Sequence, residues 1–460
     1  MRQASFVLWL VLALSLSSFV FASLSKRAIA PVLGILLISF GMFAYAIAPV
    51  FGPMGDDLYW FTARPPPKAV SRITTAAILA ICALMLWRGR RLLLRRPRRW
   101  LAAVAILAAP LILTLPSLAG LNEAQPERAL LQFKFAAFLS VFLLVAAATA
   151  TVPPRSYGEK LDGAGRAVVL ILLAPVIVAF FEVALGVGPV SNIVHGVVEI
   201  RASSTFHNPN WFALSIAPGL FVACKLAAER RRLSAVALFG ACALALILSG
   251  SRSAILLACL AIVILCIALW RSDNARVVAA ILKTGTVGAA FGACTGFLAA
   301  RLVGGSANSN YWALLDRVFF WPIQMWSGDE RPWQSIRGRM GMDINGPAGP
   351  NEYNVLRGSG VVDNAYIYWL QENTVAGIAL VILMVSVLAF AIRRFSRSRT
   401  FDDALRVSVA AFVVGGGLLG QVYWAFPVWP VFGLMLGYVL QPLARDAVFD
   451  DPNEPASRKP

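Results

Sequence analysis

Residues 249–270 read SGSRSAILLACLAIVILCIALW, and this stretch indicates what kind of protein the chain is. Residues 254–270 carry no charged or hydroxyl side chain, and a run of this length falls within the range that a helix needs to cross about 30 Å of hydrocarbon. A polar turn precedes the run, and Arg271 follows it. The pattern therefore predicts a helix that spans a membrane, with polar residues exposed to water at both ends.

Similar apolar runs recur along the chain. The chain is 59% hydrophobic and 14% charged, with a mean hydropathy of +0.72, and one water-soluble core cannot enclose that much apolar surface. Helices are expected because each satisfies its own backbone hydrogen bonds in lipid. We predict an all-α, polytopic transmembrane helical bundle of about 12–13 spans with one large periplasmic loop. The spans are expected near 6–23, 29–51, 73–87, 100–120, 129–151, 167–185, 210–228, 234–250, 252–270, 277–300, 373–392, 405–423 and 428–444.

Arginine and lysine set the expected orientation, because short cytoplasmic loops are enriched in them. Every second loop fits this rule. The basic segments expected in the cytoplasm are 88–99, 230–232, the pair Arg271 and Arg276, and 393–406. We interpret the span at 6–23 as an uncleaved helix rather than as a signal peptide, because cleavage would leave Lys26 and Arg27 outside.

This topology divides the chain into N-terminal transmembrane helices at 1–165, core helices at 166–300, a periplasmic loop at 301–362, C-terminal helices at 363–444 and a cytoplasmic tail at 445–460. The tryptophans of the loop need surface to pack on, so we expect a structured cap rather than a linker.

The charge and the ligand-type residues exclude several classes of function. The net charge of +18 does not indicate nucleic acid, because the arginines lie in short loops between apolar runs. The six cysteines lie in or beside apolar runs without CxxC spacing, and the histidines are only His195 and His207. We therefore expect neither disulfides nor a metal site.

Three expected helices begin with polar motifs on the outer side. The first motif is RASSTFHNPN at 201–210, followed by an apolar run. Asn208 is a capping residue by type, and Pro209 suits a first helical turn. Arg201 and Asn210 would then face the periplasm beside the helix amides.

The second motif is SGSRSA at 249–254, a turn between two expected spans. Ser251 is expected as the N-cap of the following helix. The helix dipole and the Arg252 guanidinium together favour an anion there, above all a phosphate held by two hydrogen bonds.

The third motif is VDNAY at 362–366, at the end of the large loop. Asp363 and Asn364 are capping residues by type, and Asp363 is also a carboxylate at the membrane surface that could act as a general base. Each motif also has a purely structural explanation, in which its arginine reaches lipid headgroups and its polar residues cap helices. Glu182 differs, because a carboxylate inside an apolar run is costly and is usually functional or paired.

In their order and topology, these motifs resemble the superfamily of O-antigen ligases and O-antigen polymerases (Wzy) across roughly residues 165–445. The resemblance implies a polytopic inner-membrane glycosyltransferase whose donor is an undecaprenyl-pyrophosphate-linked glycan. It implies that Arg201 and Arg252 hold the donor pyrophosphate, so that transfer needs no metal and no cofactor. Arg317 and Arg339 in the loop would bind further phosphate or acidic sugars. The other substrate-binding residues would be Asn208, Asn210, Ser251, Asn364, Tyr366 and Glu182.

Asp363 departs from the pattern of the ligases, which commonly carry His at this point. The Asp-Asn-x-Tyr form is similar to exopolysaccharide polymerases, so we expect a polymerase of exopolysaccharide or O-antigen repeat units, acting on a glycan acceptor with a chain-length regulator as a possible partner.

A ligase that builds lipopolysaccharide by transfer to lipid A core is the nearest alternative, and a protein-directed transferase is another. A solute transporter is the alternative from a different class, although the polar residues gather at one face rather than at the midplane.

Overall fold

The computed structural model describes residues 97–115, 126–150, 190–194, 197–202, 209–272, 274–302, 365–372, 374–419, 422–423 and 428–441, with parts of 76–87 and 175–184. The expected spans at 6–23 and 29–51 and the tail at 445–460 lie outside these residues, as does the loop expected at 301–362 apart from its first two residues, which are the last residues of a helix rather than loop.

The described residues are helical apart from one short hairpin, which confirms the helical class of the fold. Five segments are long and apolar enough to cross a membrane, as expected for a multi-pass membrane protein. They comprise α8 (Pro209–Ile216) with α9 (Gly219–Ala228), α10 (Arg232–Ser249), α11 (Arg252–Trp270), α12 (Ala275–Leu302) and α18 (Thr374–Ser398). The other helices with described bounds are α4 (Pro97–Thr114), α5 (Pro126–Ala150), α17 (Ala365–Glu372), α19 (Phe401–Leu419) and α20 (Val428–Leu440).

The hairpin lies in the segment expected to be a loop before the first motif. Strand β1 (Val190–Val194) pairs antiparallel with β2 (Val197–Arg201), and Val190 lies opposite Arg201. The alternating side chains of a strand give no long apolar run, so a search for membrane spans does not register them.

Two expected boundaries differ from the structure for identifiable reasons. The span expected at 210–228 is interrupted between α8 and α9, where Pro218 cannot donate a backbone hydrogen bond. The basic segment expected as a loop at 393–406 is mostly helical, because α18 continues to Ser398 and α19 already begins at Phe401. Buried ion pairs within that segment allow the helices to continue beyond the apolar runs.

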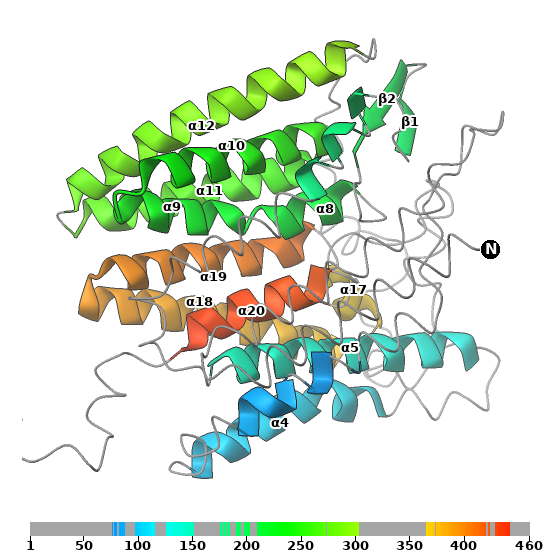
Figure 1. Ribbon diagram of the computed structural model, residues 1–460. Helices are drawn as coiled ribbons and strands as arrows, with labels where there is room; N and C mark the ends of the chain where they lie inside the picture. The colour runs from blue at the N-terminus through cyan, green and yellow to red at the C-terminus, as the bar shows by residue number, and fades with distance from the viewer. Residues whose placement is uncertain are drawn as a thin grey trace, which may run out of the picture.

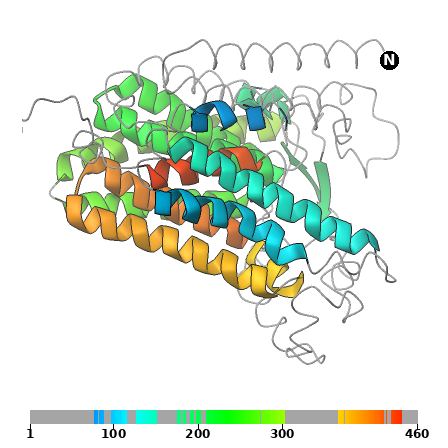
Figure 2. The ribbon, with the colours of Figure 1, turned by 90° about the horizontal axis from the view of Figure 1, so that it is seen from below.

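The helices lie nearly parallel in two adjoining layers, with α8 to α12 forming one and α17 to α20 packing beside α4 and α5 in the other (Figure 1). Figure 2 shows the same long helices running side by side when the molecule is seen from below. Glycines allow helices to pack closely: Gly288 of α12 lies on Val236 and Phe239 of α10. Large apolar side chains are exposed on α11, α12 and α18, among them Leu260, Phe291 and Ile382, as expected for helices that face lipid.

Candidate functional site

The turn between α10 and α11 carries the second polar motif, and its hydrogen bonds fix its shape. Gly250 has φ 59°, a left-handed conformation that ends α10, and its N–H donates to the carbonyl oxygen of Ile247 at 3.0 Å. The Ser249 hydroxyl donates to the carbonyl oxygen of Leu246 at 2.8 Å and accepts from the N–H of Ser251 at 3.2 Å. Helix α11 therefore starts directly after a rigid turn.

Ser251 occupies the N-cap position of α11, as the sequence predicts, but its side chain does not cap the helix. The residue is extended, with φ −84° and ψ 92°, and its carbonyl oxygen accepts the first helical hydrogen bond, from Ile255 at 3.0 Å. The side chain is 1% exposed, and its hydroxyl has no hydrogen-bond partner within the described part of the chain. A buried hydroxyl without a partner is costly, and this makes the position a candidate contact for a ligand.

The end of the β hairpin is attached to the last turn of α10, next to this turn. The N–H of Ala202, one residue after Arg201, donates to the carbonyl oxygen of Leu248 at 2.9 Å, and Ala202 is fully buried. Only the backbone of Arg201 is described, as the last residue of β2. The backbone at positions 201 and 202 thus lies at the same end of the bundle as Arg252, whose side chain is half-buried.

The start of α8 reaches the same end. The Cys242 thiol of α10 donates to the carbonyl oxygen of Ile216 of α8 at 3.6 Å, which sets the register of the two helices. Asn210 and Leu248 are each about 9 Å along their helices from this contact, in the direction of the hairpin. The half-buried Asn210 therefore lies at the level of the turn before α11.

Helix α17, which begins within the third motif, is held against the last turns of α19. The Tyr366 hydroxyl contacts the carbonyl oxygen of Val414 at 2.9 Å and the hydroxyl of Tyr423 at 2.7 Å, and Tyr423 also donates to Val413 at 2.9 Å. Burial raises the pKa of the Tyr366 hydroxyl, so this group stays protonated at neutral pH. These contacts give Tyr366 an internal structural role.

Helix α11 packs on the same part of α19 from another side. Leu257 of α11 lies against Gly415, and the Ser408 hydroxyl donates to the carbonyl oxygen of Ala261. The two contacts show that α11 and α19 are antiparallel, so the end of α11 that carries Arg252 lies near the end of α19. Figure 1 shows β1, β2, α8 and α17 gathered at this end of the molecule.

The described parts of the three motifs therefore share one end of the bundle. Position 201, Asn210, Ser251, Arg252 and Tyr366 are placed there. The remaining predicted site residues, Asp363, Asn208, Asn364, Glu182, Arg317 and Arg339, lie outside the described residues, and their roles stay predictions.

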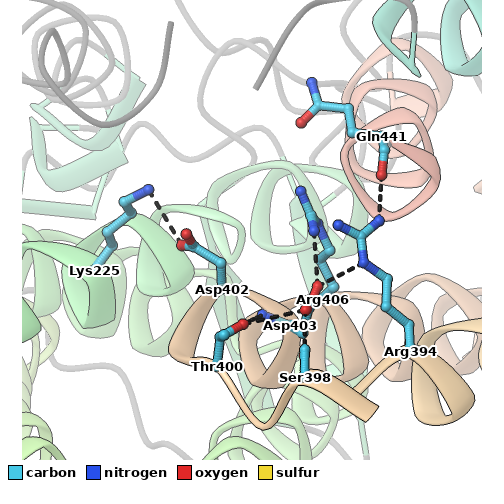
Figure 3. A network of polar contacts seen from close by, with 8 residues as sticks. All are labelled: Lys225, Arg394, Ser398, Thr400, Asp402, Asp403, Arg406 and Gln441. Carbon is cyan, nitrogen blue, oxygen red and sulfur yellow. Dashed lines mark hydrogen bonds and ion pairs between the residues drawn. The ribbon is translucent and has the colours of Figure 1, made fainter. Parts of the chain in front are cut away.

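The opposite end of the bundle holds a polar cluster that the sequence interpretation missed (Figure 3). Asp403 of α19 is 1% exposed and pairs with Arg394 of α18 and with Arg406 of its own helix. The spacing of Asp403 and Arg406, on one face of a helix, was the available signal. Charge patterning alone predicts a basic loop here and gives no sign that Arg394 of another helix pairs with Asp403.

Among the described residues, no group of three or more His, Cys, Asp or Glu side chains lies close enough to hold a metal ion. All six cysteines are free, and Cys82, Cys224 and Cys242 are buried among apolar side chains. No protein-family model, curated protein or solved structure matches the chain.

Proposed function

We propose that the chain is a membrane glycosyltransferase that uses an undecaprenyl-pyrophosphate-linked glycan at the periplasmic face and polymerises exopolysaccharide or O-antigen repeat units. The observation that supports this most directly is the hydrogen bond from Ala202 to Leu248, which ties the residue after Arg201 to the turn before Arg252. Two arginines that begin from neighbouring backbone positions at one membrane surface can share one diphosphate.

The start of α11 suits the charge of such a donor. The first-turn amides of a helix have no acceptor within the helix, and its dipole is positive at that end. Arg252 is the first residue of α11, and the buried Ser251 hydroxyl adjoins it. These groups favour a phosphate whose isoprenoid tail stays in the bilayer beside the exposed apolar surface of the helices.

The proposed reaction is a single displacement. An acceptor sugar hydroxyl loses its proton to the Asp363 carboxylate, and its oxygen forms a bond to the anomeric carbon of the donor. The bond from that carbon to the pyrophosphate oxygen breaks, and the leaving group keeps the electron pair. Arg201 and Arg252 stabilise the developing negative charge, which requires neither a metal nor a cofactor.

The distribution of buried charge favours an enzyme over a solute transporter. Within the described helices, the buried charged residues are Arg394, Asp403 and Arg406, and all three lie at the end opposite the proposed donor site. A transporter would be expected to carry polar or charged groups near the midplane, at broken helices. A ligase would share the donor site and differ in its acceptor.

The test is formation of polymer from a lipid-linked repeat unit in membranes that contain equal amounts of each variant. We expect Arg252→Ala to slow transfer about 100-fold, because it removes a group that stabilises the leaving charge, and Asp363→Ala to slow it by at least as much. Arg276→Ala is the matched control, because Arg276 is an exposed arginine at the other end of the bundle. Undiminished polymer from both Arg252→Ala and Asp363→Ala would refute the proposal.

A further inference from the structure

Two arginines at the basic end of the bundle share a single buried carboxylate. Arg394 and Arg406 are 8% and 6% exposed, and Asp403 between them is 1% exposed (Figure 3). Arg394 comes from α18, whereas Asp403 and Arg406 come from α19. The cluster is far along the helices from the Ser251 turn and takes no part in the proposed transfer.

Both carboxylate oxygens of Asp403 already have partners. Its Oδ1 atom lies 2.7 Å from Arg394 Nε and 2.8 Å from Arg406 Nη1. Its Oδ2 atom accepts hydrogen bonds from the Ser398 hydroxyl and, at 3.1 Å, from the Thr400 hydroxyl. Both oxygens of Asp403 are thus engaged, by two ion pairs and two hydroxyl groups, which leaves little capacity for the other guanidinium N–H groups.

Those other groups are only partly satisfied. Arg394 Nη1 donates to the carbonyl oxygen of Gln441, and the Arg406 guanidinium lies 5.2 Å from the centre of the Tyr438 ring. Arg394 Nε, Arg394 Nη2 and Arg406 Nε are buried, and none of them has a hydrogen-bond partner among the residues that the structure describes; Arg394 Nε meets Asp403 as an ion pair alone. Two guanidinium groups and one carboxylate leave one positive charge, which an arginine cannot lose by deprotonation.

The nearby acids do not supply the missing negative charge. Asp402 is largely exposed and pairs with Lys225 at 3.4 Å, while Glu229 pairs with Arg231 at 3.8 Å. The other charged side chains around the ends of α18 and α19 are basic and exposed, namely Arg393, Arg397 and Arg399. A negatively charged group from outside the described residues would offset the remaining positive charge.

We propose that Arg394 and Arg406 form a phosphate-binding site at the basic end of the bundle, distinct from the site proposed for the glycan donor. A phosphate offers several acceptor oxygens to the remaining guanidinium N–H groups, and arginine binds it in a forked geometry. The cluster lies where α18 ends and α19 begins, and Ile392, two residues before Arg394, is 50% exposed. The ends of membrane-spanning helices are where phospholipid headgroups are expected. An anionic phospholipid headgroup and free phosphate share the chemistry that this site recognises.

The test is a binding measurement on the purified full-length protein in detergent, by native mass spectrometry and by the shift in unfolding temperature. The probes are phosphatidylglycerol, phosphatidylcholine and inorganic phosphate. We expect phosphatidylglycerol to bind and stabilise the protein more than phosphatidylcholine does, and Arg406→Gln to weaken that binding about fivefold. Arg397→Gln is the matched control, because Arg397 is an exposed arginine in the last turn of α18.

The arms of the experiment separate the two sources of phosphate. Binding of inorganic phosphate that depends on Arg406 assigns the site to free phosphate, whereas binding of phosphatidylglycerol alone assigns it to a headgroup; either result supports the site. If Arg406→Gln fails to fold, Arg406→Lys is the second variant. It keeps the positive charge but cannot donate two parallel hydrogen bonds to a phosphate, and it should weaken binding by less than the factor expected for Arg406→Gln. The proposal is overturned if neither probe binds better than phosphatidylcholine, if Arg397→Gln weakens binding as much as Arg406→Gln, or if binding begins only once residues 445–460 are removed.

Discussion

The hydroxyl of Ser249 accepts a hydrogen bond from the N–H of Ser251 at 3.2 Å, while the hydroxyl of Ser251 itself, 1% exposed, has no partner among the described residues. Ser249 and Ser251, which lie in one turn, therefore have different roles. Ser249 holds the turn between α10 and α11 together, and Ser251 presents an unused polar group beside Arg252. The difference allows a structural effect to be separated from a ligand effect.

We predict that Ser251→Ala leaves the stability of the protein unchanged or slightly raised, because it removes a buried polar atom that gains nothing in the free protein. In an assay of the proposed transfer, the same change should raise the KM for the proposed lipid-linked donor about tenfold if the hydroxyl donates to a phosphate oxygen. Unfolding in detergent and the kinetics of transfer measure the two effects. Loss of stability with an unchanged KM would assign Ser251 to the fold alone.

Ser249→Ala is the matched comparison and should behave in the opposite way. Its hydroxyl donates to Leu246 at 2.8 Å and accepts from Ser251, so its removal leaves buried backbone groups without partners. We expect a loss of about 1–3 kcal/mol in the free energy of unfolding.

The close contact between α10 and α12 gives a prediction that does not depend on function. A Cβ atom at Gly288 would lie 2.6 Å from the carbonyl oxygen of Val236 and 2.6 Å from Cβ of Phe239. At Gly285, one turn earlier on α12, the nearest atom would be in the Phe239 ring at 3.6 Å. We expect Gly288→Ala to lower the free energy of unfolding by about 1–3 kcal/mol, because the helices must separate.

Gly285→Ala should leave that free energy unchanged or raise it slightly, since the methyl group makes an ordinary contact and alanine favours the helix. Thermal unfolding of both variants in the same detergent checks the pair. Equal behaviour of the two variants would show that α10 and α12 do not approach each other as described.

The tyrosine pair that holds α17 should behave as one unit. Tyr366 and Tyr423 have two hydroxyl protons for three contacts, to Val413, to Val414 and to each other. Each change to Phe should cost about 1 kcal/mol, and the double variant should cost less than the sum. A double-mutant cycle on unfolding measures the coupling.

If the chain has the proposed transferase activity, we expect Tyr366→Phe and Tyr423→Phe to slow it to a similar extent, because both act through the position of α17. A much larger loss for Tyr366→Phe alone would instead indicate that Tyr366 contacts the substrate, as the sequence predicts.

The sequence predicts the long helices well and the links between them poorly. The spans expected at 234–250, 252–270 and 277–300 match α10, α11 and α12 closely, because a charged or glycine residue ends each apolar run abruptly. Pro218 was visible but lies within a hydrophobic run, so hydropathy alone gave no break there.

The sequence predicts the three motifs of the candidate site, but it does not predict that they lie close together in space. Hydropathy and charge predict that the motifs lie on the same side of the membrane, whereas tertiary contacts such as Ala202 with Leu248 show that their described parts lie together. The Asp403 cluster was missed for the same reason, because Arg394 belongs to another helix and hydropathy treats both arginines only as topology signals.

The Asp403 cluster finally predicts a dependence of stability on pH. Burial alone would raise the pKa of Asp403, but the hydrogen bond from Ser398 and the guanidinium groups of Arg394 and Arg406 outweigh it and hold the pKa below the ordinary value of 3.8. Because the folded pKa is lower than the unfolded one, the carboxylate stabilises the fold above pH 3.8, and this contribution is lost as the pH falls through the folded pKa. Asp403→Asn should lower the free energy of unfolding by about 3–5 kcal/mol at neutral pH. It should also reduce the acid slope, meaning the fall in unfolding temperature as the pH is lowered. Asp402→Asn, which changes a mostly exposed neighbour that pairs with Lys225 at 3.4 Å, should keep the slope of the wild type. Unfolding temperatures measured in detergent from pH 3 to 7 test this prediction, and an Asp403→Asn protein with an unaltered acid slope would contradict it.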